Sequence, residues 1–179
     1  MKNLNVKLVF YRTLFSQSAA SVTMGSLSSF LSRNKIENSL ILLEKNNFHS
    51  IENIFDDINS ETVIIAKPNF KDFCQMFQVL SEIKKQGLIN KIFLCGPYAS
   101  LNYYSLIKEL KWLDGVIVGN PEETASELLK LLKKGKFNYN CRGGIWRNSE
   151  NKTISSYRSR DYKLKLNDLP FPNRDIEIN

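Results

Sequence analysis

The sequence is poor in cysteine and histidine, and this scarcity argues against several kinds of site. Its three cysteines, Cys74, Cys95 and Cys141, are odd in number and widely spaced, which is unlike a disulfide framework. No two of them stand at CxxC spacing, so no zinc or iron–sulfur site can be read from this chain alone. We interpret the one histidine, His49, as a surface or half-buried residue rather than a base or a metal ligand.

Long apolar runs are missing as well. No stretch approaches the ~20 apolar residues that a membrane-spanning helix needs. The N-terminal MKNLNVKLVFYR has too short an apolar stretch for a signal peptide and no small-residue cleavage site. We therefore expect a cytoplasmic chain with no membrane partner. The sequence also has no G-x-S-x-G, P-loop or G-x-G-x-x-G motif, so we assign no catalytic residue to the chain by itself.

What the chain does have is an uneven basic charge. Its 179 residues are 42% hydrophobic, which fits one domain with a real core, and the net charge is +7. Residues 136–165 carry eight basic and two acidic side chains. Such a ribbon could meet nucleic acid, a phosphate-bearing ligand or an acidic partner, although a solvated charged surface is the simpler interpretation. Because few aromatic residues interleave with these charges, nucleic acid is the least favoured of our hypotheses.

Apolar runs alternate with helical spacing along the first 135 residues. The runs predict strands at 6–11, 39–43, 62–66, 92–94 and 115–119, with helices between them. One of these is a short helix over 51–58, and another runs from about Phe70 to Gly87. Asn120 can cap the last helix, with Pro121 at its first position. The pattern predicts an α/β fold: a flavodoxin-like, doubly wound, parallel five-stranded sheet of order 2-1-3-4-5.

The alternation stops after Gly135. Residues 143–147 and 153–157 indicate two short strands, so we expect a small C-terminal β-hairpin extension, covered by Trp146. Two prolines in 168–174 indicate a stiff connector. We therefore divide the chain into a Rossmann-like domain (1–135), a basic hairpin extension (136–166) and a linker (167–179).

The carboxyl ends of parallel strands meet at one edge, where such folds bind ligands. The segments after strands one, three, four and five are therefore candidate binding loops. Each segment also has a purely structural explanation, because Gly-Pro is a common turn and Asn-Pro-Glu-Glu is a common helix cap. Their joint placement is what favours a ligand site. The candidate binding residues are Thr13, Ser16, Ser21, Lys67, Pro68, Asn69, Gly96, Pro97, Tyr98, Ala99, Ser100, Gly119, Asn120 and Glu122.

Two features of this edge bear on other functions. The first and third strands end in Tyr11-Arg12 and Ala66-Lys67, whereas a phosphoacceptor receiver domain needs acidic residues there. Cys95 could be a reactive thiol, but a cysteine that ends a buried strand is more often a small core residue.

The chain resembles a known protein family in five segments. They are GSLSSFL (25–31), CGPYAS (95–100), DGVIVGNPEET (114–124), GGIWR (143–147) and DLPFPNR (168–174). In this order they resemble the N-terminal cobalamin (vitamin B12)-binding domain of cobalamin-dependent radical S-adenosylmethionine (SAM) enzymes, over essentially the whole chain. Two positions depart from the pattern: Cys95 replaces the usual second glycine, and Asn120 replaces a common acidic residue.

The resemblance implies that the chain binds cobalamin. Residues 96–100 would contact the buried nucleotide tail, and the loops after the first and third strands would lie under or beside the corrin ring. No histidine lies between Arg12 and Gly25, so the resemblance implies a histidine-off mode.

The resemblance also implies a partner. S-adenosylmethionine and a [4Fe-4S] cluster would belong to a radical SAM catalytic domain, C-terminal to this chain or in trans, docked on the basic ribbon from Lys136 to Lys165. We thus expect a cobalamin-binding module of a radical SAM enzyme, a methyltransferase. The alternative is a cofactor-free, flavodoxin-like protein-interaction domain.

Overall fold

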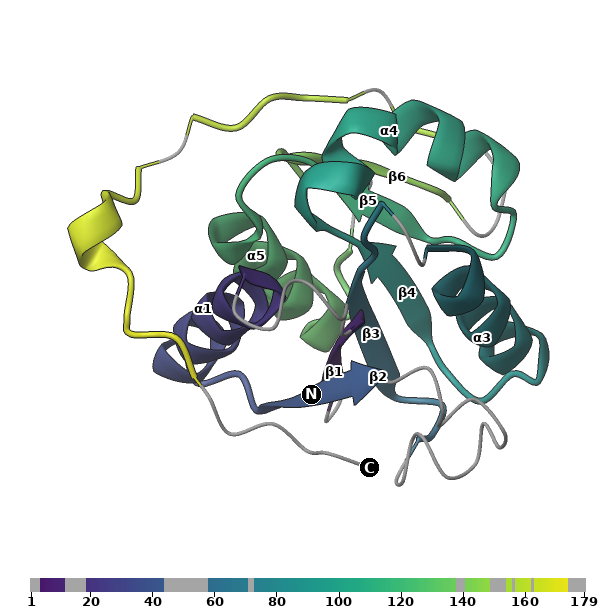
Figure 1. Ribbon diagram of the computed structural model, residues 1–179, viewed down its shortest axis with the longest axis horizontal. Coiled ribbons are helices and arrows are strands. Elements are labelled where there is room, and N and C mark those ends of the chain that lie inside the picture. Colours follow the sequence, from purple (N-terminus) through teal and green to yellow (C-terminus); the bar gives the residue numbers. More distant parts are fainter. Residues whose placement is uncertain are drawn as a thin grey trace.

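The computed structural model describes residues 4–11, 19–43, 58–70, 73–137, 141–148, 154–155, 157–161 and 163–173. They form one six-stranded sheet of order β2-β1-β3-β4-β5-β6 (Figure 1). The strands are β1 (Asn5–Tyr11), β2 (Asn38–Leu43), β3 (Thr62–Lys67), β4 (Lys91–Leu94), β5 (Gly115–Ile117) and β6 (Gly144–Trp146). The first five are parallel and have the predicted order, which confirms the doubly wound part of the prediction.

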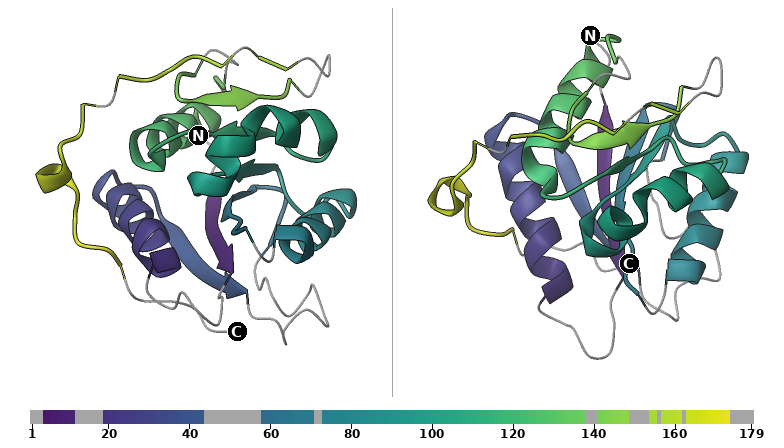
Figure 2. Two further views of the ribbon diagram at one scale, coloured as in Figure 1. Left: turned by 45° about the horizontal axis from the view of Figure 1, so that its top comes forward. Right: turned by 90° about the horizontal axis from the view of Figure 1, so that it is seen from above.

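Helices cover both faces of this sheet. They are α1 (Ala19–Arg33), α3 (Phe73–Lys85), α4 (Gly96–Glu109) and α5 (Pro121–Lys133), with a short 3₁₀ helix η1 (Leu166–Asp168) near the C-terminus. α1 and α5 pack on one face, and α3 and α4 on the other (Figures 1 and 2). Residues 51–57 of the predicted short helix, and His49, lie outside the described residues.

Strand β3 shows how the two faces share the core. Val63 and Ile65 pack in the apolar cluster under α1 and α5, whereas Ile64 and Ala66 pack in the cluster under α3 and α4. This alternation is the two-residue period of a strand. Because both faces are covered by helices, the strand reads in the sequence as a continuous apolar run.

The predicted separate hairpin is wrong in one respect, because its first strand is part of the main sheet. β6 pairs antiparallel with β5, and Trp146, which we expected to cover a hairpin, is completely buried. Two glycines leave the space for its indole: a Cβ on Gly115 or on Gly144 would lie 2.4 Å from the Trp146 ring. The indole Nε1–H donates to the Cys141 carbonyl at 2.8 Å. Residues 147 and 154 form a single antiparallel bridge, so part of the expected hairpin pairing remains.

The segment 96–100 was expected to be a loop, but α4 begins directly at Gly96. Gly96 has φ +88°, a left-handed conformation that a residue with a side chain adopts only with strain. Pro97 is in the first turn of α4, where its missing N–H costs no hydrogen bond. The glycine thus lets the chain turn from strand into helix without an intervening loop.

Residues 157–161 and 163–173, which we call the closing segment, run outside α5 and α1 (Figure 2). The Asn173 backbone N–H donates to the Gly25 carbonyl at 3.0 Å, and Arg33 Nη1 donates to the Asp168 carbonyl at 3.0 Å. Arg160 forms an ion pair with Glu127 of α5. The closing segment is therefore attached to both helices.

Part of the basic ribbon is also used inside the molecule. Arg147 Nε donates to the Leu113 carbonyl at 2.9 Å, and Arg147 Nη2 reaches the carbonyls of Ile107 and Leu110 at the end of α4. Carbonyls at the end of a helix lack partners within it, and a guanidinium satisfies them well. The Arg147 charge therefore holds α4 against β6.

Candidate functional site

The carboxyl ends of β1, β3, β4 and β5 lie along one edge of the sheet, and the strand order reverses between β1 and β3. Ligands bind at such a reversal in open parallel sheets. At this edge the structure describes residues 68–70 after β3 and the connections after β4 and β5. The segment after β1, which includes Thr13 and Ser16, lies outside the described residues, as does the side chain of Ser21 in α1.

Lys67, the last residue of β3, lies across the start of α4. A Cβ built on Gly96 would be 3.0 Å from Cγ of Lys67, 3.5 Å from Cδ and 3.4 Å from Cε. The lysine stem therefore covers a backbone position that has no side chain of its own. Burial lowers the pKa of Lys67, because leaving water disfavours the charged ammonium.

Cys95 directly precedes Gly96 in the chain. It is completely buried, and its Sγ is 3.9 Å from Sδ of Met24. Burial raises the pKa of Cys95 to about 12, with a smaller opposing effect from Lys67. A thiol with this pKa is protonated at neutral pH and is a poor nucleophile. Cys95 is thus a core residue, as its position at the end of a strand suggested.

The side chains at the start of α4 face two different parts of the molecule. Ala99 is completely buried, and the Tyr98 ring stacks on Phe73 of α3 with ring centres 4.8 Å apart. These two candidate residues therefore serve the core on the α3 side. Ser100 faces the next connection instead, because its Oγ accepts the Gly119 backbone N–H at 3.0 Å. That bond joins the start of α4 to the turn before α5.

At the third connection, Asn120 is exposed at the N-cap of α5, and its side chain makes no capping hydrogen bond, contrary to the expectation from the sequence. Glu122, in the first turn, is only 7% exposed. Burial raises the pKa of Glu122, and its charge in turn raises the pKa of Cys95. Glu122 and Lys67 thus both lie near the buried thiol.

The structure therefore brings together part of the predicted set. Lys67, Gly96, Ser100, Gly119 and Glu122 converge around the carboxyl ends of β3, β4 and β5. Pro68 is buried, Asn69 is half-buried, and Pro97 is exposed at the start of α4.

Sequence reasoning missed one residue at this edge. Phe70 was assigned to a helix, but it lies before α3 and is 61% exposed. Its ring meets that of Tyr98 edge to face, with centres 5.2 Å apart. A helical spacing from Phe70 through Phe73 and Phe77 hid this position, and the only opposing signal was Pro68 just before it.

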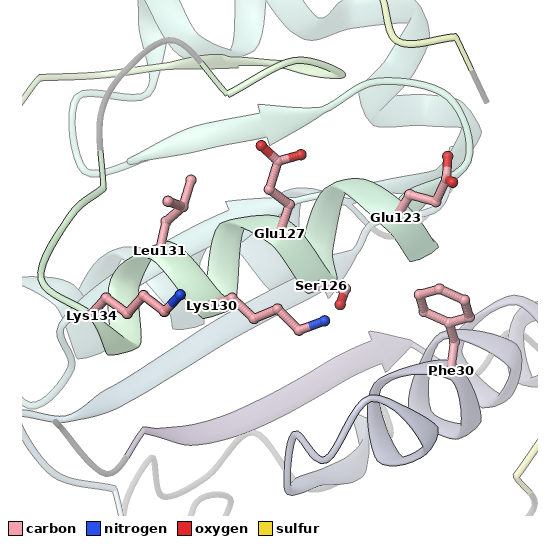
Figure 3. A pocket seen from close by; sticks show the side chains of 7 residues that line it. All are labelled: Phe30, Glu123, Ser126, Glu127, Lys130, Leu131 and Lys134. Carbon is pink, nitrogen blue, oxygen red and sulfur yellow. The ribbon is translucent and has the colours of Figure 1, made fainter. Parts of the chain in front are cut away.

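A separate groove of about 430 Å³ lies on the outer side of α5, beside α1 (Figure 3). It is lined by Phe30, Glu123, Ser126, Glu127, Lys130, Leu131 and Lys134. Two of its charged groups already have partners within the chain: Glu127 pairs with Arg160, and Lys130 donates to Asn34 Oδ1 at 2.9 Å. We therefore interpret the groove as a helix–helix junction beside the closing segment rather than as a ligand site.

Two absences hold for the part of the chain that the structure describes. No group of three or more His, Cys, Asp or Glu residues is arranged to hold a metal ion there. None of the described helices combines the length and the apolar character that crossing a bilayer requires.

Comparison with known proteins identifies the fold. No family model and no curated protein matches the sequence. Among solved structures, the cobalamin-dependent S-adenosylmethionine radical enzyme OxsB, with aqua-cobalamin and S-adenosylmethionine bound, aligns over 96% of this chain with a TM-score of 0.72 and 18% identity. TsrM from Kitasatospora setae, a radical S-adenosylmethionine methyltransferase with cobalamin and a [4Fe-4S] cluster bound, aligns over 94% with a TM-score of 0.69 and 12% identity.

This chain shares its fold with part of both enzymes. The resemblance seen in the sequence is thus confirmed at the level of fold, since both neighbours are of the cobalamin-dependent radical SAM kind. The match spans 24% of the OxsB chain and 31% of the TsrM chain.

Proposed function

We propose that this chain is the cobalamin-binding module of a cobalamin-dependent radical SAM enzyme, and that the parent enzyme is a methyltransferase. The supporting observation is the fold likeness over nearly the whole chain to OxsB and TsrM, both solved with cobalamin bound. S-adenosylmethionine and the [4Fe-4S] cluster would be held by a radical SAM domain, joined C-terminally or acting in trans. When bound, the corrinoid cobalt supplies the methyl-transfer chemistry, while this chain binds and orients it.

Features of the carboxyl edge support this proposal. The floor at Gly96 has no Cβ, and what covers it is a flexible lysine stem rather than backbone or a packed ring. A hydrogen bond from the Gly119 N–H to Ser100 Oγ joins the two flanking connections to each other. Lys67 and Asn120 add polar groups for which the described residues provide no hydrogen-bond partner.

We further propose that cobalt has no histidine ligand from this chain. The described edge holds no histidine, the sequence has none between Arg12 and Gly25, and His49 comes after β2 in the chain. Electron paramagnetic resonance of the bound, reduced cobalt tests this directly. With 15N-labelled histidine in the protein, we expect no nitrogen splitting that responds to the label, and a 15N doublet would contradict the histidine-off mode.

Binding itself is tested by titrating the purified chain with aquacobalamin and following the visible spectrum, then passing the mixture through a desalting column. We expect a saturable spectral change and a corrinoid that elutes with the protein. A protein that stays colourless at every corrinoid concentration would contradict the proposal and would favour the cofactor-free interaction domain.

Two glycine variants provide a matched pair for the same titration. Gly96→Ala and Gly87→Ala both place a Cβ at positive φ (+88° and +71°), so both carry a similar backbone strain, on the order of 1 kcal/mol. Gly96 lies at the proposed site, whereas Gly87 lies between α3 and the amino end of β4, where a Cβ would meet no atom within 4 Å. We expect Gly96→Ala alone to weaken corrinoid binding. Equal binding by the two variants would remove this edge from the proposed site.

A further inference from the structure

The Lys67 side chain packs on a glycine at the proposed site. It ends β3 beside the point where the strand order reverses, and its stem packs on Gly96 with carbon atoms 3.0–3.5 Å from the position of a Cβ. A lysine stem commonly covers apolar surface, but its ammonium then reaches water or an acceptor. Here the residue is half-buried at the proposed cofactor site.

The Lys67 ammonium has no acceptor among the described residues, with which it makes neither a hydrogen bond nor an ion pair. Two other partly buried lysines are paired: Lys84 Nζ lies 2.8 Å from one Asp114 oxygen, and Lys91 Nζ lies 2.9 Å from the other. The Lys67 side chain is half-buried and its ammonium is not fully enclosed, so water solvates it in the free chain and an anion that reaches this edge can take the place of that water.

Among the described residues, no acidic group pairs with the Lys67 ammonium. Cys95 is the neighbour whose ionised form would attract Lys67, but it is protonated at neutral pH because burial raises the pKa of Cys95 to about 12. Glu122 also lies near Cys95, and its charge acts on the thiol. The most favourable acceptor is therefore an anion brought by a ligand to this edge.

We propose that Lys67 binds the phosphodiester in the nucleotide tail of cobalamin, and that its stem must leave Gly96 when the tail enters. The inference rests on the proposed function. The side chains of the corrin ring are neutral amides, whereas the tail carries one negative phosphodiester, which is the group that matches an unpaired ammonium. Lysine is a common phosphate-binding residue, acting as a compact point charge.

The test compares two corrinoids that differ in this group. Cobalamin has the nucleotide tail with its phosphodiester, and cobinamide lacks both. Dissociation constants are measured by visible titration for the wild type, Lys67→Met and Lys67→Arg. Methionine keeps an apolar stem over Gly96 and removes the charge, while arginine keeps the charge. Lys136→Met, at an exposed position, is the control for the change in net charge.

For Lys67→Met we expect cobalamin to bind about ten- to a hundredfold more weakly, the usual worth of a hydrogen bond to a charged group. Cobinamide affinity should stay the same or improve, Lys67→Arg should bind cobalamin nearly as well as the wild type, and Lys136→Met should match the wild type with both corrinoids. Thermal unfolding of each variant establishes that it is folded.

The outcomes separate the inference from the proposed function. Equal losses for cobalamin and cobinamide, or no loss for either, would overturn the role of Lys67 while leaving corrinoid binding in place. A wild-type chain that binds neither corrinoid would contradict the proposed function, and the inference would fall with it.

Discussion

Asp114 offers the most direct test of how the sheet is held at its amino edge. Its carboxylate accepts from Lys84 Nζ at 2.8 Å, Lys91 Nζ at 2.9 Å and the Ile92 backbone N–H at 2.9 Å, and only 9% of the side chain is exposed. Asp114→Ala leaves two partly buried ammonium groups and one buried N–H without this acceptor. Removing one member of a buried charge pair typically costs about 3–5 kcal/mol.

The lysines moderate this loss. Their side chains are 22% and 17% exposed, so both ammonium groups can turn towards water once the carboxylate is gone. We therefore expect Asp114→Ala to lower the free energy of unfolding by about 3 kcal/mol, the low end of that range. Asp114→Asn can still accept from the Ile92 N–H but loses the charge, and we expect a loss of about 2 kcal/mol.

Urea unfolding followed by circular dichroism measures both values, with an unchanged dependence on urea concentration as the sign that only stability has changed. Glu82→Ala is the control, because it breaks an exposed ion pair with Lys85. The Glu82 side chain is 46% exposed and the Lys85 side chain is 71% exposed. That pair is worth less than about 0.5 kcal/mol. If Asp114→Ala costs no more than Glu82→Ala, the carboxylate does not anchor the sheet and this reasoning is wrong.

Contacts elsewhere in the molecule support two more predictions. A Cβ on Gly25 would lie 2.3 Å from the Asn173 carbonyl oxygen, so Gly25→Ala should release the end of the closing segment. We expect faster cleavage of this segment in limited proteolysis, while the core melts at nearly the same temperature. An unchanged cleavage rate would show that this contact does not hold the segment. Because burial raises the pKa of Cys95 to about 12, its thiol stays protonated up to strongly alkaline pH, whereas Cys74 is exposed. Mass spectrometry after iodoacetamide treatment at about pH 8 should find Cys74 modified and Cys95 untouched until the chain is unfolded, and early modification of Cys95 would refute its burial.

Local pattern explains why most of the sheet was predictable. β3 reads as a continuous apolar run because both of its faces are buried, and the spacing of apolar residues in α5, with Pro121 at its start, is that of a helix with one buried face. These signals depend on residues near one another in the chain. They are visible without knowledge of the tertiary structure.

The errors lie where distant residues decide the conformation. Residues 143–147 indicate a strand, but whether that strand forms its own hairpin depends on Gly115, some thirty positions earlier, which leaves the space for the Trp146 ring. The same is true of the start of α4. The Gly-Pro pair predicts a turn. The positive φ of Gly96 permits that turn to lead directly into α4, and the packing of α4 on β5 and β6 is what the sequence does not show.

For the candidate site, the sequence by itself determined which residues come after each strand. Its scarcity of cysteine and histidine also determined that familiar catalytic and metal-binding patterns are absent from it. Tertiary structure decided which of those residues meet. It turned Ala99 and Tyr98 towards the core, joined Ser100 to Gly119, and laid Lys67 over Gly96. The physical reason is that hydrophobic periodicity is a local property of a chain, whereas burial of a charge and the space above a glycine depend on neighbours that only folding brings together.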